Sequence, residues 1–214
     1  STISNNRSDS DNNASGTGGA IQVSAGAVTL ENTIVDGNFT GTGSTVSEIN
    51  GSVTANFSLI GNVTGATIGG ASNQLGASAR LATLANNGAQ TVGPVGFTAV
   101  LQTHALGAGS PALDNGSNAL SSAAGLTTDQ RGTGYARVLD AADLDVTDET
   151  DIGAHEAHPS VEDALDAAIN EDGSYVVTIN LGDADLAFDA VGAASSNTTL
   201  VPNSPGNISL SGSG

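Results

Sequence analysis

Apolar residues near the start of the chain occur in short alternating runs rather than at helical spacing. Between Gly18 and Asn38 there are three such runs, residues 20–23, 28–30 and 34–35, separated by a few polar or glycine residues. Alternation is the period of β-strands with one buried face. The gaps are too short for crossover helices, and no Asn-Gly hairpin turn lies between the first two runs. The pattern therefore predicts a parallel β-helix, in which each coil stacks on the previous one.

A strand-plus-asparagine motif recurs along the same region. Residues 1–6 match residues 32–37 at a spacing of 31, and residues 58–62 match residues 33–37 at a spacing of 25. A variable period is typical of a solenoid whose bends accept insertions, and the alternative is chance similarity in a Ser/Thr/Asn/Gly-rich chain. Asparagine tolerates left-handed backbone geometry, so we expect bends at six asparagines. These are Asn5, Asn6, Asn12, Asn13, Asn38 and Asn62.

Six short motifs then follow one another in a fixed order. They are Asn-Phe-Ser-Leu-Ile-Gly (56–61), Leu-Ala-Asn-Asn-Gly (84–88), Thr-His-Ala-Leu (103–106), Gly-Ser-Pro-Ala-Leu-Asp-Asn-Gly (109–116), Asp-Gln-Arg-Gly (129–132) and Asp-Ile-Gly-Ala-His-Glu (151–156). This series resembles the choice-of-anchor Q domain of bacterial surface proteins over about residues 1–157. The resemblance implies the C-terminal coils and cap of a right-handed parallel β-helix, related to polymorphic outer-membrane proteins and adhesins. His155 stands where the family has an aromatic residue, which is expected to loosen the packing of the cap.

The pattern changes again after residue 157. His158, Pro159 and Ser160 interrupt it, and we interpret residues 158–170 as a linker. Residues 170–174 and 196–202 resemble the tandem Ig-like, cadherin-like repeats of giant bacterial surface proteins. The expected fold class is thus all-β: β-helix coils with a cap over residues 1–157, and a partial Ig-like β-sandwich, a truncated repeat, over residues 171–214. Thr98 to Leu106 is expected to form one more strand of the first part.

Acidic residues outnumber basic ones by 22 to 4, which gives a formal charge of -18. Such a chain repels phosphate backbones and anionic lipid surfaces, so nucleic-acid binding is excluded. No apolar run approaches the roughly 20 residues of a spanning helix, so this segment is not expected to insert into a membrane. The absence of Cys excludes disulfides and thiolate metal sites. Cations are the natural partners, and solubility of an extracellular protein is the alternative explanation of the charge.

Carboxylates at short intervals make Ca²⁺ the candidate cofactor, because Ca²⁺ takes six to eight oxygen ligands. The stretch from residue 140 to 151 is not an EF-hand, since it has no glycine at the turn position. Asp-x-Asp at residues 183–185 has the spacing that cadherin-like repeats use. The alternative is solvated surface charge. The candidate ligands are Asp140, Asp143, Asp145, Asp148, Asp183 and Asp185.

Arg131, one of only four basic residues, lies between turn-forming residues in the motif at 129–132. An arginine can bridge two carboxylates with its planar fork. We therefore expect a structural clamp in which Arg131 pairs with Asp114, Asp151 or Glu156. The two histidines at 155 and 158 are three residues apart, so they do not form the His-Glu-x-x-His zinc motif.

The first functional hypothesis is a non-catalytic structural or adhesive module of a large secreted or cell-surface bacterial protein, a β-helix stalk end. Its expected location is extracellular, secreted or associated with the outer membrane, and its expected partners are surface glycans or other proteins. The alternative is a carbohydrate-active β-helix enzyme, a polysaccharide lyase or hydrolase, whose active site lies mostly outside these residues. A hydrolase needs two carboxylates across a cleft, and the alternating strands carry almost none.

Overall fold

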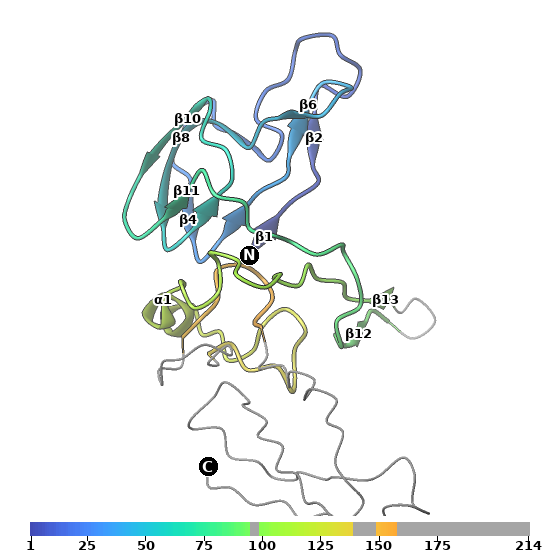
Figure 1. The fold of residues 1–214 in the computed structure, drawn as a ribbon, viewed down its shortest axis with the longest axis vertical. Helices are drawn as coiled ribbons and strands as arrows, with labels where there is room; N and C mark the ends of the chain where they lie inside the picture. The colour runs from blue at the N-terminus through green and yellow to red at the C-terminus, as the bar shows by residue number, and fades with distance from the viewer. Residues whose placement is uncertain (95–98, 139–148, 158–214) are drawn as a thin grey trace, which may run out of the picture. The chain divides into compact units, whose positions relative to one another are not determined.

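Short β-strands dominate the computed structural model of the chain, which describes residues 1–94, 99–138 and 149–157 (Figure 1). Helix α1 (Asn118–Ala123) is the one helix in these ranges, and the predicted all-β class is confirmed. No helix of the described part is long and apolar enough to cross a membrane. The predicted linker at 158–170 and the truncated repeat at 171–214 lie outside the described residues. Below, residues 1–76 are called the strand region and the described residues from 77 to 157 the loop region.

The first sheet of the strand region is a four-stranded parallel sheet in the order β1-β5-β9-β11. Each strand is two residues long, and each neighbour comes from a later stretch of the chain. Their bounds are β1 (Thr2–Ile3), β5 (Ile34–Val35), β9 (Leu59–Ile60) and β11 (Gln74–Leu75). The pairing of Ile34 with Leu59 has the spacing of 25 that the repeated motif predicts, so this register is confirmed.

A second parallel sheet is built on the long strand β8 (Ile49–Asn56), with β10 on one side and β3 and β4 on the other. The remaining strand pairs are β2 parallel to β6, β6 antiparallel to β7, and β12 antiparallel to β13. The predicted short runs correspond to β3, β4 and β5. The bounds are β2 (Arg7–Ser8), β3 (Ile21–Gln22), β4 (Thr29–Glu31), β6 (Phe39–Thr40), β7 (Thr45–Val46), β10 (Ala66–Gly69), β12 (Thr91–Val92) and β13 (Ala99–Val100).

The predicted register of the first repeat is wrong by one residue. The spacing of 31 aligns Ile3 with Ile34, but in the structure Ile3 pairs with Val35 and Thr2 with Ile34. A one-residue slip exchanges the two faces of a strand. The observed register packs Ile3 against the aliphatic cluster that contains Val35, and it lets the hydroxyl of Thr2 accept a hydrogen bond from Ala154 N–H at 3.0 Å. The side-chain chemistry of Thr2 and Ile3 thus explains the register that the motif match missed.

Both faces of the central strands β5 and β9 are buried, which corrects the expectation of one buried face. Val35 and Ile60 point into a cluster with Leu30 and Ile49 inside the strand region. Their neighbours point the other way, into a second cluster formed with the loop region. That second cluster consists of Ile34, Leu59, Ala79, Ala112 and Ile152, with Leu81 and Leu106 against it. Adjacent apolar residues, rather than alternating ones, are the sequence mark of a strand buried on both faces.

The loop region covers the outer face of this sheet with little regular structure. Gly153, at φ +119°, approaches the sheet so closely that a Cβ there would lie 2.7 Å from Ile34 Cδ1. Helix α1 begins after Ser117, whose side chain caps the Leu120 N–H. Of the strand expected from Thr98 to Leu106, the described residues form β13 and two isolated bridges, Thr103 to Ala85 and Leu106 to Leu81.

Candidate functional site

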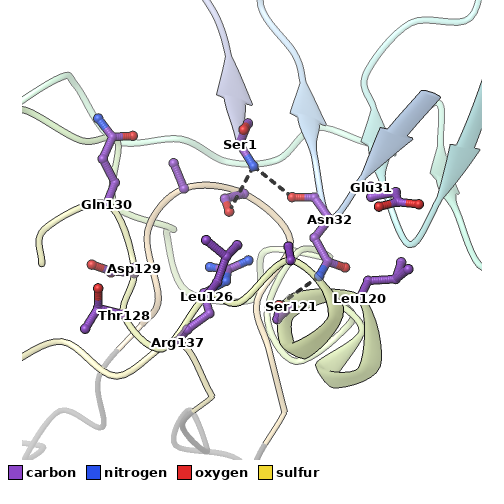
Figure 2. A pocket seen from close by; sticks show the side chains of 13 residues that line it. Ser1, Glu31, Asn32, Leu120, Ser121, Leu126, Thr128, Asp129, Gln130 and Arg137 are labelled. Carbon is purple, nitrogen blue, oxygen red and sulfur yellow. Dashed lines mark hydrogen bonds between the residues drawn. The ribbon is translucent and has the colours of Figure 1, made fainter. Parts of the chain in front are cut away.

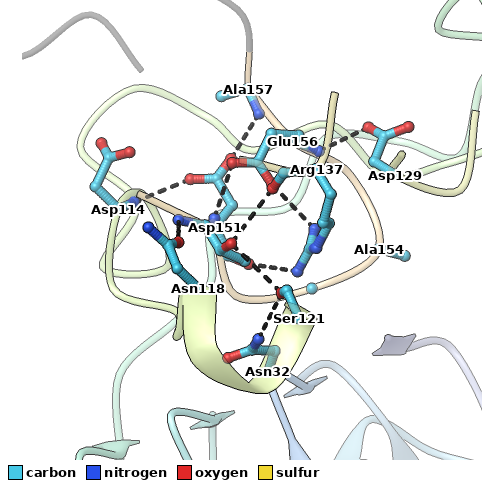
Figure 3. A network of polar contacts seen from close by, with 12 residues as sticks. Asn32, Asp114, Asn118, Ser121, Asp129, Arg137, Asp151, Ala154, Glu156 and Ala157 are labelled. Carbon is cyan, nitrogen blue, oxygen red and sulfur yellow. Dashed lines mark hydrogen bonds and ion pairs between the residues drawn. The ribbon is translucent and has the colours of Figure 1, made fainter. Parts of the chain in front are cut away.

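Three buried acidic residues and two buried arginines gather in the loop region, and Figure 3 labels Asp129, Arg137, Asp151 and Glu156 among them. Asp129, Arg131, Arg137, Asp151 and Glu156 are between 0 and 6% exposed, and they are called the ion cluster below. They come from two segments, 129–137 and 151–156, that lie beside helix α1. Charges at such depth are costly unless each is paired and hydrogen-bonded. The contacts of each residue therefore decide what the cluster does.

Arg131 binds Asp129 with two nitrogens. Its Nε donates to Asp129 Oδ2 at 2.8 Å and its Nη2 lies 2.7 Å from the same oxygen, while its main-chain N–H donates to Oδ1. The guanidinium also donates to the main-chain oxygens of Asn87 and Glu156, and it lies 3.8 Å from the ring centroid of Tyr135. One arginine thereby ties three separate stretches of the loop region together.

Arg137 forms the second ion pair. Its Nη1 lies 3.0 Å from Glu156 Oε2, and its Nη2 donates to the main-chain oxygen of Asp151 at 2.7 Å. Glu156 Oε1 accepts the Asp151 N–H at 3.0 Å. The Asp151 carboxylate in turn accepts the N–H groups of Asp114 and Ala157. These contacts close the chain from 151 to 157 into a tight loop around two carboxyl groups.

The cluster holds three carboxyl groups against two guanidinium groups. Burial raises the pKa of Glu156 to about 9, helped by the charge of Asp151 and opposed by Arg137. Burial also raises the pKa of Asp151 to about 6. The ion pair with Arg137 favours the charged form of Glu156, so burial and Arg137 act on this pKa in opposite directions.

This geometry suits a structural role. Asp151 and Glu156 are both fully buried, and their oxygens are occupied by main-chain N–H groups and Arg137. A glycoside hydrolase needs its two carboxyl groups open to a sugar and a water between them. Here both groups face the interior of the loop region, so they position backbone rather than substrate.

The predicted clamp is wrong in its ion pair. Arg131 was expected to pair with the carboxylate of Asp114, Asp151 or Glu156, but its carboxylate partner is Asp129. Arg131 reaches Glu156 only at the main-chain oxygen, and it is Arg137 that pairs with the Glu156 carboxylate. Asp114 contributes its main-chain N–H, which donates a hydrogen bond to the Asp151 carboxylate. The turn from Asp129 to Gly132 places the nearest carboxylate two residues before the arginine, a local contact that outcompetes the distant ones.

A pocket of about 310 Å³ opens next to the ion cluster, between helix α1 and the strand region (Figure 2). Its wall combines apolar Leu120 and Leu126 with polar Glu31, Asn32 and Gln130. Arg137 and Asp129 also line it, but their charged groups are held by the ion cluster. The volume is at the lower end of the range of small-molecule sites.

Asn32 joins the two regions from one side of this pocket. Its Oδ1 accepts the Ser117 N–H at 2.8 Å, and its Nδ2 donates to the Ser117 oxygen at 2.9 Å and to Ser121 Oγ at 3.0 Å. Its main-chain oxygen accepts the Gly153 N–H. A single left-handed asparagine, at φ +44°, therefore connects the end of β4 to the start of α1 and to the loop after Ile152.

A buried acid of the strand region, Glu48, was not found from the sequence, although its partner Asn38 was expected at a bend. Glu48 is fully buried, and its carboxylate accepts hydrogen bonds from the N–H of Gly37 and from the main chain and side chain of Asn38. Asn38 in turn donates to the Ile3 oxygen and accepts from Asn6 Nδ2 at 3.0 Å. Burial raises the pKa of Glu48, and the Asn38 donors oppose that rise. Asn6 and Asn38 are two of the six asparagines expected at bends, whereas Glu48 gave no signal because its partners lie ten or more residues away.

The predicted Ca²⁺ ligands Asp140, Asp143, Asp145, Asp148, Asp183 and Asp185 all lie outside the described residues. Within the residues that the structure describes, no three His, Cys, Asp or Glu side chains are grouped so that they could hold a metal ion. The Ca²⁺ hypothesis stays a prediction.

Comparison with known proteins gave no family model, no curated protein and no solved structure that matches this chain.

Proposed function

We propose that the chain is a non-catalytic structural or adhesive module of a large secreted or cell-surface bacterial protein. In this proposal residues 1–157 are the last coils and the cap of a right-handed parallel β-helix. Surface glycans or other proteins are its partners, and Ca²⁺ bound by the acidic residues 140–148 or 183–185 stiffens it. The motif series that resembles the choice-of-anchor Q domain supports the family assignment.

The observation that carries the proposal is the stacking of sequence-distant strands in parallel. β1, β5, β9 and β11 follow one another in chain order across a single sheet. The longer parallel sheet repeats this relation, since Thr54 of β8 pairs with Thr29 of β4 and with Gly69 of β10. Parallel neighbours joined by bends and loops of this length support the proposal of stacked β-helix coils. The loop region then covers buried apolar surface, as a terminal cap must.

A cysteine pair tests the stacked arrangement directly, because the chain contains no native cysteine. Thr29 and Thr54 are exposed and directly paired, so the variant Thr29→Cys/Thr54→Cys should form a disulfide without strain. Closing this loop is expected to raise the free energy of unfolding by about 3 kcal/mol. The matched control, Thr29→Cys/Ser52→Cys, is two residues out of register on the same exposed face and should not oxidise. Equal oxidation of both pairs would contradict the stacked register.

A panel of uronate and neutral polysaccharides tests the function itself. The chain should release no unsaturated or reducing ends from any of them, and any glycan contact should appear as binding alone. Product release that survives repurification would replace the proposal with the carbohydrate-active enzyme.

Unfolding with and without millimolar Ca²⁺ tests whether the ion stabilises the chain. The variant Asp143→Ala/Asp145→Ala should reduce this stabilisation if residues 140–148 form the site. Ca²⁺ stabilisation that persists in that variant would point to Asp183 and Asp185 instead.

A further inference from the structure

Four dipeptides in the described residues are prone to spontaneous ring closure. They are Asp36–Gly37, Asn50–Gly51, Asn87–Gly88 and Asn115–Gly116. In each, the amide nitrogen of the glycine can attack the carbonyl carbon of the preceding side chain, and a glycine offers no side chain to hinder the attack. The chain contains no Cys, Met or Trp, so the usual oxidation targets are missing from it. We propose that Asn87 is the site at which the folded protein undergoes spontaneous deamidation first.

Three of the four glycine nitrogens are shielded by contacts with distant parts of the chain. Gly51 N–H donates to the Gly65 oxygen within the parallel sheet, and Gly116 N–H donates to the Thr150 oxygen at 2.7 Å. Gly37 N–H donates to the buried carboxylate of Glu48 at 2.9 Å. Each bond must open before the nitrogen can react, and opening it disturbs a sheet, the loop region or a buried acid.

Gly88 differs in the bond that holds its N–H. Its partner is the side-chain oxygen of Asn86, two residues away and exposed to solvent, at 3.0 Å. An exposed local hydrogen bond to a side chain opens without any change in the rest of the fold, and the distant contact that ring closure must also break is that of Asn87 Nδ2 with Thr103. Water and hydroxide therefore reach the Gly88 nitrogen more often than the other three.

A positive charge beside the Asn87–Gly88 peptide also favours ring closure at this site. The Arg131 guanidinium donates to the main-chain oxygen of Asn87, which is the carbonyl of the Asn87–Gly88 peptide. A cation on that oxygen stabilises the anion formed when the Gly88 nitrogen loses its proton. At Gly37 the neighbouring group is instead a carboxylate, which opposes the same anion. Among the four dipeptides in the described residues, Asn87–Gly88 thus combines the least shielded nitrogen with the most favourable charge.

Water is the only co-reactant that this deamidation needs. The deprotonated Gly88 nitrogen attacks Cγ of Asn87, a new N–Cγ bond forms, and the Cγ–Nδ2 bond breaks. Ammonia leaves with the two side-chain hydrogens and the proton taken from Gly88. Water then opens the succinimide ring at either carbonyl and gives aspartate or isoaspartate at position 87.

The product would loosen the loop region locally. Asn87 Nδ2 donates to both the main-chain oxygen and the hydroxyl of Thr103 at 2.9 Å. Aspartate has no donor for the Thr103 oxygen and places negative charge against it. The bridge between Ala85 and Thr103 lies beside these contacts and should open more often in the deamidated chain.

Peptide mass spectrometry of the folded 214-residue chain, aged at mildly alkaline pH, tests the proposal. Conversion at Asn87 should be about fivefold faster than at Asn50 or Asn115, the factor expected for one additional net hydrogen bond. In urea the three Asn-Gly pairs should convert at similar rates, because their local sequences are alike. Asn50 or Asn115 converting first in the folded chain would overturn the proposal.

A variant isolates the shielding bond. Asn86→Ala removes the acceptor of the Gly88 N–H at an exposed position and should raise the rate at Asn87 by up to about fivefold. The rates at Asn50 and Asn115 serve as internal controls and should stay as they are. An unchanged rate at Asn87 would show that the Asn86 contact does not limit the reaction and would contradict the argument.

Discussion

In the strand region main-chain groups pair with main-chain groups along parallel strands, whereas in the loop region side chains make the long connections. β5 and β9 are joined by bonds such as Leu59 N–H to the Thr33 oxygen, with aliphatic side chains on both faces. The loop region depends on buried arginines and carboxylates that bind backbone from several loops. The comparison teaches that paired strands satisfy their own peptide groups and are packed mainly by aliphatic side chains, whereas the buried peptide groups of irregular loops need specific polar partners.

The largest expected effects come from two neighbouring residues that face opposite clusters. Leu59→Ala opens a cavity between the sheet and the loop region, and Ile60→Ala opens one inside the strand region. Each should lower the free energy of unfolding by about 2–5 kcal/mol, as measured by urea denaturation. Leu75→Ala, at a site 49% exposed in the next strand, is the control and should cost about 0.5 kcal/mol or less. A small cost for Leu59→Ala would mean that the sheet has only one buried face.

The ion cluster predicts a loss of stability at high pH. The pKa of Glu156 is about 9 in the folded chain against an ordinary value of 4.5, so its contribution is complete below pH 4.5 and is lost as the pH rises toward 9. In that window the free energy of unfolding should fall by at most about 1.4 kcal/mol per pH unit for this one proton.

The variant Glu156→Gln sharpens the test, since glutamine keeps the shape and neutrality of the protonated acid. It should match the parent in stability below pH 4.5 and lack the decline between pH 4.5 and 9, so it should be the more stable of the two at neutral pH. Glu31→Gln, at an exposed position, should leave the decline unchanged. If Glu156→Gln retains the full decline, the proton does not reside on Glu156.

The smallest effect concerns the register of β1. Thr2→Val removes the acceptor of the Ala154 N–H while keeping the shape of the side chain, and it should cost about 1 kcal/mol in thermal or urea unfolding. Thr29→Val, exposed in β4, is the control and should stay within about 0.5 kcal/mol of the parent. If β1 instead had the register of the motif match, the Thr2 side chain would lie on the other face of the sheet. Both variants would then have the same small effect on the free energy of unfolding.

The sequence predicted the strand region better than the loop region for a physical reason. Alternation and a repeated motif located β3, β4 and β5 and the pairing of Ile34 with Leu59, because the same local pattern recurs in paired strands. The one-residue shift in the register of β1 was missed because it depends on the hydroxyl of Thr2 binding Ala154, which is 152 residues away in the sequence. Local patterns carry no information about such a partner.

The same limit applies to the candidate site. Of the expected clamp residues, Arg131, Asp151 and Glu156 lie in one buried cluster, and Asp114 donates its main-chain N–H to Asp151 of that cluster. The pairing of carboxylates with arginines depends on the turn at Asp129 and on the position of Arg137. Neither feature follows from the periodicity or the composition of the sequence. The sequence signal that was available is the Asp two residues before Arg131.

Hydrogen exchange of the variant Asn32→Gly tests most directly whether the loop region docks on the strand region as a separable layer. Glycine tolerates φ +44°, so the substitution removes only the side-chain bonds to Ser117 and Ser121. The account predicts faster exchange in α1 and around Gly153, with protection retained in β5 and β9. Equal loss of protection in β5, β9 and α1 would contradict it, because the two regions would then unfold as one unit.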